Sequence, residues 1–212
     1  MIRLPSRINF SALLTSKALF DMAMQTLVLG VGDAGQAALL EIAKAKLTNA
    51  RLIAINTYAE QPPETSIIES IHLGGSGFGA GGNPEIAAKV VQDNHAQIVG
   101  LLDSKPNRVY LIAGLGGGTG TGMLPVIANI VHKTNIAVYA IVSLPFAFEG
   151  QQRKQIAERG LSALTSSHIQ DVIVVKGDVM ASRLLSKTPE ISDTMQRLSQ
   201  SLSWHLLAHL TG

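Results

Sequence analysis

The sequence contains no cysteine, and only 4% of its residues are aromatic. The lack of thiols excludes disulfide bonds and thiolate metal sites, and it is compatible with the reducing cytoplasm, where we expect this protein. No apolar run approaches the ~18 residues that a membrane-spanning helix needs, so we expect no direct membrane insertion.

Charge is also scarce, with 15% charged residues and a net charge of +2. The 17 lysines and arginines are scattered and form no basic stripe interleaved with aromatics, so we expect no nucleic-acid partner. The six histidines show no metal-ligand spacing: His205 and His209 are four residues apart but lack a third ligand, and we predict no metal site built from protein ligands alone. What the chain does have is 46% hydrophobic residues in 212 positions, enough for one globular domain.

Residues 1–24 differ from the rest, because they carry basic residues and serines but no acid before Asp21. Three interpretations stay open: an organelle transit peptide, a helix that packs on the domain, or an extension upstream of a true start at Met22 or Met24. We therefore divide the chain into an N-terminal extension, 1–24, and one domain, 25–212.

Apolar segments alternate with helical patterns from residue 25 onward. The expected helices cover 36–46, a segment from Pro84, 123–134, 149–164, 178–186 and 192–210, and residues 57–82 form a long connection. The expected strands are 26–30, 51–56, 108–113, 136–143 and 171–175. This order predicts an α/β fold, a three-layer domain of Rossmann-like type with a mostly parallel sheet. Such sheets bind ligands at the carboxyl ends of their strands, where the unusual segments of this sequence lie.

The stretch GLGGGTGTG, residues 114–122, stands between a strand pattern and a helix pattern. A flexible linker does not connect such elements, whereas a phosphate site needs exposed backbone N–H groups at a helix N-terminus. The N–H groups of this loop and the hydroxyls of Thr119 and Thr121 are therefore predicted to hold phosphates.

A second glycine loop, GVGDAG at residues 30–35, fits the dinucleotide fingerprint of Rossmann-type NAD(P)-binding proteins. The second strand, however, ends in Asn56 and Thr57 rather than in the acid that would hold a ribose, and no Walker A motif occurs. The carboxylate of Asp33 would repel phosphates, so either Mg²⁺ lies between them or this side chain points outward.

Five motifs occur in the order in which one family has them: GVGDAGQAA, AINTYAE, GFGAGGNPEIA, GGGTGTG and PFAFEGQQRKQIAERG. Together they resemble the nucleotide loops of the tubulin/FtsZ superfamily, and of FtsZ in particular. Within the first two of these loops the sequence departs from FtsZ at three positions: FtsZ usually has glycine at position 33, asparagine at 37 and aspartate at 58, where this chain has Asp33, Ala37 and Tyr58.

The resemblance implies binding of GTP or GDP with Mg²⁺, and a cytoskeletal protein that forms or modulates filaments in cell division or membrane remodelling. Partners would be further copies of the chain or a full-length FtsZ-like protein. A non-catalytic interaction module on the same fold stays open as an alternative. The expected nucleotide-binding residues are Gly32, Asp33, Ala34, Gly35, Gln36, Asn56, Gly81, Gly82, Asn83, Gly116, Gly117, Gly118, Thr119, Gly120, Thr121, Pro145, Glu149, Arg153, Asp178 and Asp193.

Base recognition and catalysis follow the family less closely. Where FtsZ usually has PND to recognise guanine, this chain has VKGDVM, in which Asp178 offers a carboxylate acceptor for guanine. Asp193 and Met195 correspond to the family's aspartate and base-stacking aromatic. The family's catalytic loop N-x-D-x-x-D is not in this sequence, so we assign no catalytic residue and expect weak or no GTP hydrolysis by this chain alone. The leucine face of the last helix is expected to contact either a partner or the domain's own sheet.

Overall fold

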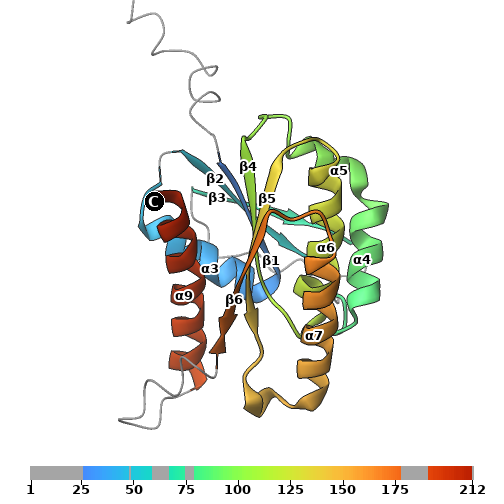
Figure 1. Cartoon of the computed structure of the whole chain (residues 1–212), viewed down its shortest axis with the longest axis vertical. Coiled ribbons are helices and arrows are strands. Elements are labelled where there is room, and N and C mark those ends of the chain that lie inside the picture. The colour runs from blue at the N-terminus through green and yellow to red at the C-terminus, as the bar shows by residue number, and fades with distance from the viewer. Residues whose placement is uncertain (1–25, 48, 59–66, 75–78, 178–190, 212) are drawn as a thin grey trace, which may run out of the picture.

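One sheet of six parallel strands forms the centre of the computed structural model, which describes residues 26–47, 49–58, 67–74, 79–177 and 191–211 (Figure 1). The strand order is β3-β2-β1-β4-β5-β6. The strands are β1 (Thr26–Val31), β2 (Ala50–Asn56), β3 (Ile68–His72), β4 (Arg108–Gly114), β5 (Ala137–Leu144) and β6 (Asp171–Lys176). All pairs are parallel, so every carboxyl end lies on the same edge.

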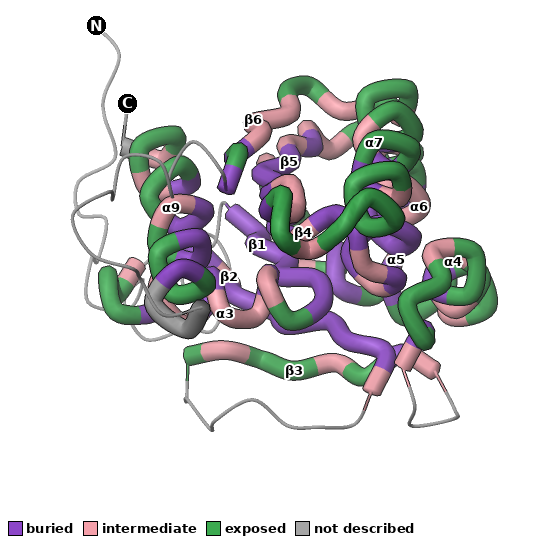
Figure 2. Tube along the Cα trace, turned by 90° about the horizontal axis from the view of Figure 1, so that it is seen from below, coloured by how far each residue is buried: buried purple, intermediate pink, exposed green. Residues whose placement is uncertain are grey.

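Helices cover both faces of the sheet (Figures 1 and 2). One face carries α3 (Gly32–Lys44) and α9 (Ile191–Thr211), and the other carries α4 (Pro84–Asp93), α5 (His95–Gly100), α6 (Gly118–His132) and α7 (Gln151–Thr165). The short 3-10 helix η1 (Ala147–Glu149) precedes α7. The predicted three-layer α/β architecture is confirmed.

Strand β1 shows why the central strands are apolar throughout. Leu27, Leu29 and Val31 pack into the cluster formed with α4 to α7, whereas Val28 packs into the cluster under α3 and α9. Because successive side chains of a strand point to opposite faces, a sheet covered on both sides favours apolar residues at nearly every position. All six residues of β1 are buried.

The sheet has one strand more than the sequence predicted. The five expected strands are present, but the segment expected to be part of a long connection contains β3 at the edge of the sheet. None of its five residues is buried, so it lacks the continuous apolar pattern of the other strands. Helix α3 also begins at Gly32 rather than at residue 36, and the helix expected at 178–186 lies outside the described residues.

Helix α9 packs on its own domain. Leu198, Leu202 and Leu206 are buried against the cluster of α3 and the sheet, while Trp204 is 72% exposed. Of the two alternatives for the leucine face, the structure shows packing on the domain itself. Within the described part of the chain, no helix combines the length and the apolar character needed to cross a bilayer.

Candidate ligand site at the carboxyl edge of the sheet

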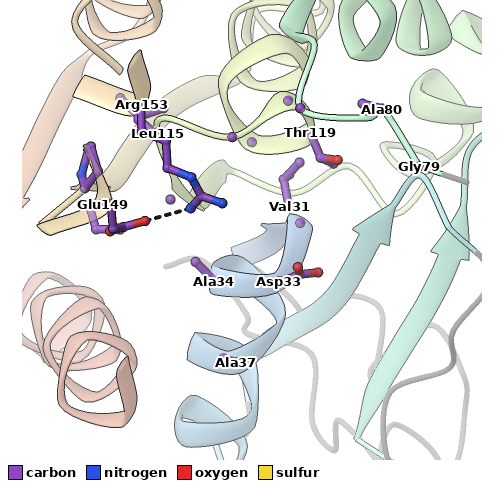
Figure 3. Close-up of a pocket in the computed structure, with 18 of the residues that line it drawn as sticks. Val31, Asp33, Ala34, Ala37, Gly79, Ala80, Leu115, Thr119, Glu149 and Arg153 are labelled. Carbon is purple, nitrogen blue, oxygen red and sulfur yellow. Dashed lines mark hydrogen bonds and ion pairs between the residues drawn. The ribbon is translucent and has the colours of Figure 1, made fainter. Parts of the chain in front are cut away.

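A cavity of about 570 Å³ lies where strands β1, β4 and β5 end and their following helices begin. Its walls come from the start of α3, residues 57–58 after β2, the loop 79–82, the start of α6, the segment from the end of β5 to the start of α7, and α9 (Figure 3). This volume falls in the range of about 300–1,000 Å³ that small-molecule sites in proteins have.

Two helix N-termini border this cavity. Helix α3 begins at Gly32, and helix α6 begins at Gly118 inside the glycine run. The N–H groups of a first helical turn have no partner within the helix, and the helix dipole adds partial positive charge there. Both first turns line the cavity, so this end of it, called the phosphate end below, has the backbone geometry that suits an anion.

Most glycines of the run allow close packing. A methyl group on Gly118 would lie 2.8 Å from the backbone nitrogen of Asn83, and one on Gly122 would lie 2.0 Å from the backbone oxygen of Pro84. These contacts seat the loop 79–83 and α4 directly on α6. Gly117 differs, because a methyl group there would meet nothing within 4 Å. Gly117 lines the cavity, so its missing side chain leaves that space open to a ligand.

The two threonines of the run have different surroundings. Thr121 is buried, lies off the cavity, and its Oγ1 accepts a 2.9 Å hydrogen bond from the N–H of Gly116. That bond holds Gly116 at a φ of +101°, which a residue with a side chain rarely adopts. Thr119 lines the cavity, and its Oγ1 is 2.9 Å from Oγ1 of Thr57. Only Thr119 of the pair thus presents its hydroxyl beside the open space.

Asp33 lies in the first turn of α3 and lines the phosphate end (Figure 3). Its Oδ1 accepts a 3.1 Å hydrogen bond from Nδ2 of Asn56 and a second, short one from the hydroxyl of Tyr58. Both donors are neutral. The three ion pairs of the described residues lie elsewhere, at Lys44–Glu41, Arg51–Glu69 and Arg153–Glu149.

The opposite end of the cavity, called the side-chain end below, is formed by Pro145, Glu149 and Arg153 together with α9. Oε1 of Glu149 accepts a 2.9 Å hydrogen bond from the N–H of Phe146, and Oε2 accepts one of 2.7 Å from Nη1 of Arg153 (Figure 3). The Glu149 side chain is 13% exposed and that of Arg153 is 57% exposed. Glu149 therefore fixes the loop, while Arg153 has room to contact a ligand.

The structure brings twelve of the expected residues to the cavity wall: Gly32, Asp33, Ala34, Gly81, Gly82, Gly117, Gly118, Thr119, Gly120, Pro145, Glu149 and Arg153. Six others do not line it: Gly35, Gln36, Asn56, Asn83, Gly116 and Thr121. Gly35 packs on β4, where a methyl group would lie 2.4 Å from the oxygen of Ile112. Asn83 caps α4 by accepting a hydrogen bond from the N–H of Glu85. Asp178 and the side chain of Asp193 lie outside the description.

Several lining residues were not expected from the sequence, among them Thr57, Ser143 and Ser199. Thr57 directly follows β2 and Ser143 stands near the end of β5, so their place at the carboxyl edge was a usable signal. Ser199 lies within α9, far along the sequence, and no local pattern marks it. Met195, the expected counterpart of the base-stacking aromatic, does line the cavity and is 38% exposed.

Comparison with known proteins agrees with the motifs. Residues 25–182, more than half of the chain, match the family model described as "Tubulin/FtsZ family, GTPase domain". The chain belongs to the tubulin/FtsZ family. This finding favours the resemblance noted in the sequence over the Rossmann-type NAD(P)-binding alternative.

Curated relatives are cell division proteins FtsZ. That of Buchnera aphidicola subsp. Acyrthosiphon pisum is 32% identical over 178 residues, which cover 82% of this chain and 46% of the relative. That of Rickettsia felis is 38% identical over 151 residues, or 70% of this chain and 33% of the relative. This tubulin/FtsZ-family chain therefore spans less than half the length of these two relatives.

Solved structures of the family share the fold. An FtsZ dimer from M. jannaschii, described as empty, has a TM-score of 0.77 at 29% identity and covers 92% of this chain and 55% of its own. A GTPγS-bound protofilament of CetZ2 from Haloferax volcanii has a TM-score of 0.76 at 24% identity, with 88% of this chain and 58% of its own covered. The second likeness concerns the fold alone. The present chain is thus an FtsZ-like domain of the tubulin superfamily.

Proposed function

We propose that the cavity binds a guanine nucleotide, GTP or GDP, with its phosphates on the N-termini of α3 and α6. The observation that carries this proposal is the convergence of two helix N-termini and a side-chain-free position, Gly117, on one end of the cavity. Such a surface of backbone N–H groups suits a chain of phosphates better than it suits a carbohydrate or a peptide. The family match supports guanine as the base.

The side-chain end would receive the nucleoside. Arg153 is the exposed partner of its pair with Glu149, so its guanidinium is available to the ribose and nearby groups. Met195, on α9, offers a flexible apolar surface for a base. Recognition of guanine by Asp178, and a contact from Asp193, stay predictions.

The oxygen donors at the phosphate end fit Mg²⁺. Mg²⁺ in nucleotide sites takes one or two protein carboxylates, substrate phosphates and water. Here the carboxylate of Asp33 and the hydroxyls of Thr57 and Thr119 line one part of the cavity. When bound, the cation would supply positive charge to the terminal phosphates.

We further propose that this 212-residue chain hydrolyses GTP slowly or not at all by itself. Activation of water needs a base within about 3 Å of it. The acids that line the cavity in the described residues are Asp33 and Glu149, and neither belongs to an N-x-D-x-x-D motif, the family's catalytic loop. Hydrolysis would then require a group from a further copy or from a full-length FtsZ-like partner, in keeping with a role in filaments.

Titration calorimetry with GTP, GDP, ATP and NAD in the presence of Mg²⁺ tests the proposal. We expect binding of GTP and GDP, weaker binding of ATP, and none of NAD. Preference for NAD, or no binding of any nucleotide, would contradict it. Sedimentation with and without GTP, alone and with a full-length FtsZ, tests the filament role: GTP-dependent pelleting or co-pelleting is expected, and unchanged sedimentation in both cases would argue against it.

A further inference from the structure

The phosphate end contains a carboxylate, whose negative charge would repel the anion that the helix N-termini attract. Two helix N-termini attract anions there, yet the carboxylate of Asp33 stands in the first turn of one of them and lines the same space. Like charges at close range repel each other strongly near a protein surface, where the effective dielectric constant is lower than in water. A bare triphosphate would therefore bind poorly beside this side chain.

No lysine, arginine or histidine of the described residues forms an ion pair with Asp33. The two hydrogen bonds that it accepts come from neutral groups, the amide of Asn56 and the hydroxyl of Tyr58. These donors fix the position of the carboxylate and bring no positive charge to it.

Both hydrogen bonds end on the same oxygen, Oδ1. Within the described residues, Oδ2 accepts none, so one carboxylate oxygen is left for a ligand. The hydroxyls of Thr57 and Thr119, which bond to each other, add two more oxygen atoms to the same end of the cavity. An acceptor-only oxygen with neighbouring hydroxyls is a donor set for a hard divalent cation, not for a phosphate.

We propose that Asp33 makes nucleotide binding by this chain depend on a divalent cation, which its carboxylate holds against the phosphates. Asn56 and Tyr58 are positioning residues that keep the carboxylate in place through Oδ1. This inference rests on the proposed nucleotide site. It assigns the metal-binding role to one acid at the start of α3. Without a cation this acid repels the nucleotide, and with a cation it binds the metal–nucleotide complex.

The proposal predicts that Asp33→Asn changes nucleotide affinity in opposite directions in the presence and in the absence of Mg²⁺. With Mg²⁺, Asp33→Asn removes a ligand of the cation and weakens binding. With EDTA, the same substitution removes a repelling charge and strengthens binding. A purely structural role of Asp33 would change affinity in the same direction in both conditions, because loss of the Asn56 and Tyr58 contacts does not depend on the cation.

The experiment measures the affinity of the fluorescent analogue mant-GDP for the 212-residue protein in Mg²⁺ and in EDTA. We compare the unmodified protein with Asp33→Asn and Tyr58→Phe. The control is Glu85→Gln, an exposed acid beside the loop 79–83 that does not line the cavity. The unmodified protein and the control should lose at least about tenfold in affinity on removal of Mg²⁺, whereas Asp33→Asn should lose about threefold or less.

Mn²⁺ supplies a readout independent of affinity for the nucleotide. Electron paramagnetic resonance should show one Mn²⁺ immobilised per bound GDP in the unmodified protein and in Glu85→Gln, with clearly weaker retention in Asp33→Asn. Tyr58→Phe should keep the site and lie between the two. Equal Mg²⁺ dependence and equal Mn²⁺ retention in Asp33→Asn and the unmodified protein would overturn the inference while leaving the nucleotide site intact. No binding of mant-GDP by the unmodified protein in Mg²⁺ would instead refute the proposed function.

Discussion

The two ends of the cavity are built from different parts of the chain. The phosphate end is made largely of main chain, at the first turns of α3 and α6 and the loop 79–82, and its glycines bring helices within contact of one another. The side-chain end is made of Glu149 and Arg153 with residues of α9. A site made of backbone tolerates little change in volume, whereas a site made of exposed side chains tolerates substitution at a modest cost in affinity.

The largest effect, on stability, is expected at Gly122, where α6 packs on α4 behind the phosphate end. Gly122→Ala places a methyl group 2.0 Å from the oxygen of Pro84, so α4 and α6 must move apart. We expect a loss of about 3 kcal/mol or more in the free energy of unfolding, measured by urea denaturation. Gly100→Ala, at the end of α5 with nothing within 4 Å of the added methyl, is the matched control and should lose nothing. Equal stabilities of the two variants would show that the contact with Pro84 does not hold the helices.

A smaller effect, on binding alone, is expected at Gly117. Its φ of −98° and ψ of 179° suit alanine, and the methyl group meets no protein atom within 4 Å. Gly117→Ala should therefore fold with unchanged stability but lose about 1.4–2.7 kcal/mol in GTP affinity, roughly tenfold to hundredfold, because the methyl occupies ligand space. Calorimetric titration beside a urea denaturation curve separates the two quantities. Unchanged affinity would mean that the phosphates lie elsewhere.

At the side-chain end the cost should be lower. Arg153→Ala removes a guanidinium whose side chain is 57% exposed, so we expect little change in stability and a loss of about 1 kcal/mol, roughly fivefold, in GTP affinity. Arg159→Ala, an exposed arginine on the same helix that does not line the cavity, is the control. A loss at Arg153 as large as that at Gly117 would remove the distinction between the two ends.

The smallest effect lies at the sheet edge, outside both ends. The guanidinium of Arg51 donates hydrogen bonds of 2.7 and 2.6 Å to Glu69 on β3, and these bonds lower the pKa of Glu69 against the opposing effect of burial. A lowered folded-state pKa stabilises the protein above the unfolded-state pKa, and this contribution disappears as the pH falls through the folded-state value. Since Glu69 is 53% exposed, solvent screening reduces the gain to about 0.5 kcal/mol.

Urea denaturation at several pH values tests that small term. At pH 7 the unmodified protein should be slightly more stable than Glu69→Gln, and the difference should vanish in the acidic range, below the ordinary glutamate pKa of 4.5. GTP affinity at pH 7 should be the same in both proteins. A stability difference that persists in acid would show that it does not come from the Glu69 charge. A change in GTP affinity would show that β3 influences the site.

The contrast between the two ends also explains what the sequence could predict. Strand-to-helix turns rich in glycine can be recognised from the local sequence, so the first turns of α3 and α6 were expected in one site, whereas Thr57 was not. Local patterns could not distinguish the roles of Thr119 and Thr121, because only the fold shows that one hydroxyl lines the cavity and the other holds Gly116. Ser199 reaches the cavity through the packing of α9, which no neighbouring residue encodes.

Strand β3 shows the same limit for the fold. Its residues are half-buried or exposed because it forms the sheet edge, so its apolar pattern is too weak to stand out from a connection. Its pairing with β2, from Leu52 opposite Ile68 to Asn56 opposite His72, is a long-range property. The central strands are buried on both faces, so their continuous apolar pattern could be recognised from the sequence alone.

The central claim is that the backbone at the start of α3 and α6 binds the phosphates, and backbone amide NMR tests it most directly. Adding GDP with Mg²⁺ to ¹⁵N-labelled protein should shift the amide signals of Gly32 to Ala34 and Gly117 to Gly120, and guanosine, which lacks phosphates, should leave these signals nearly unchanged. Shifts that are absent from both first turns, or that guanosine reproduces in full, would contradict the account.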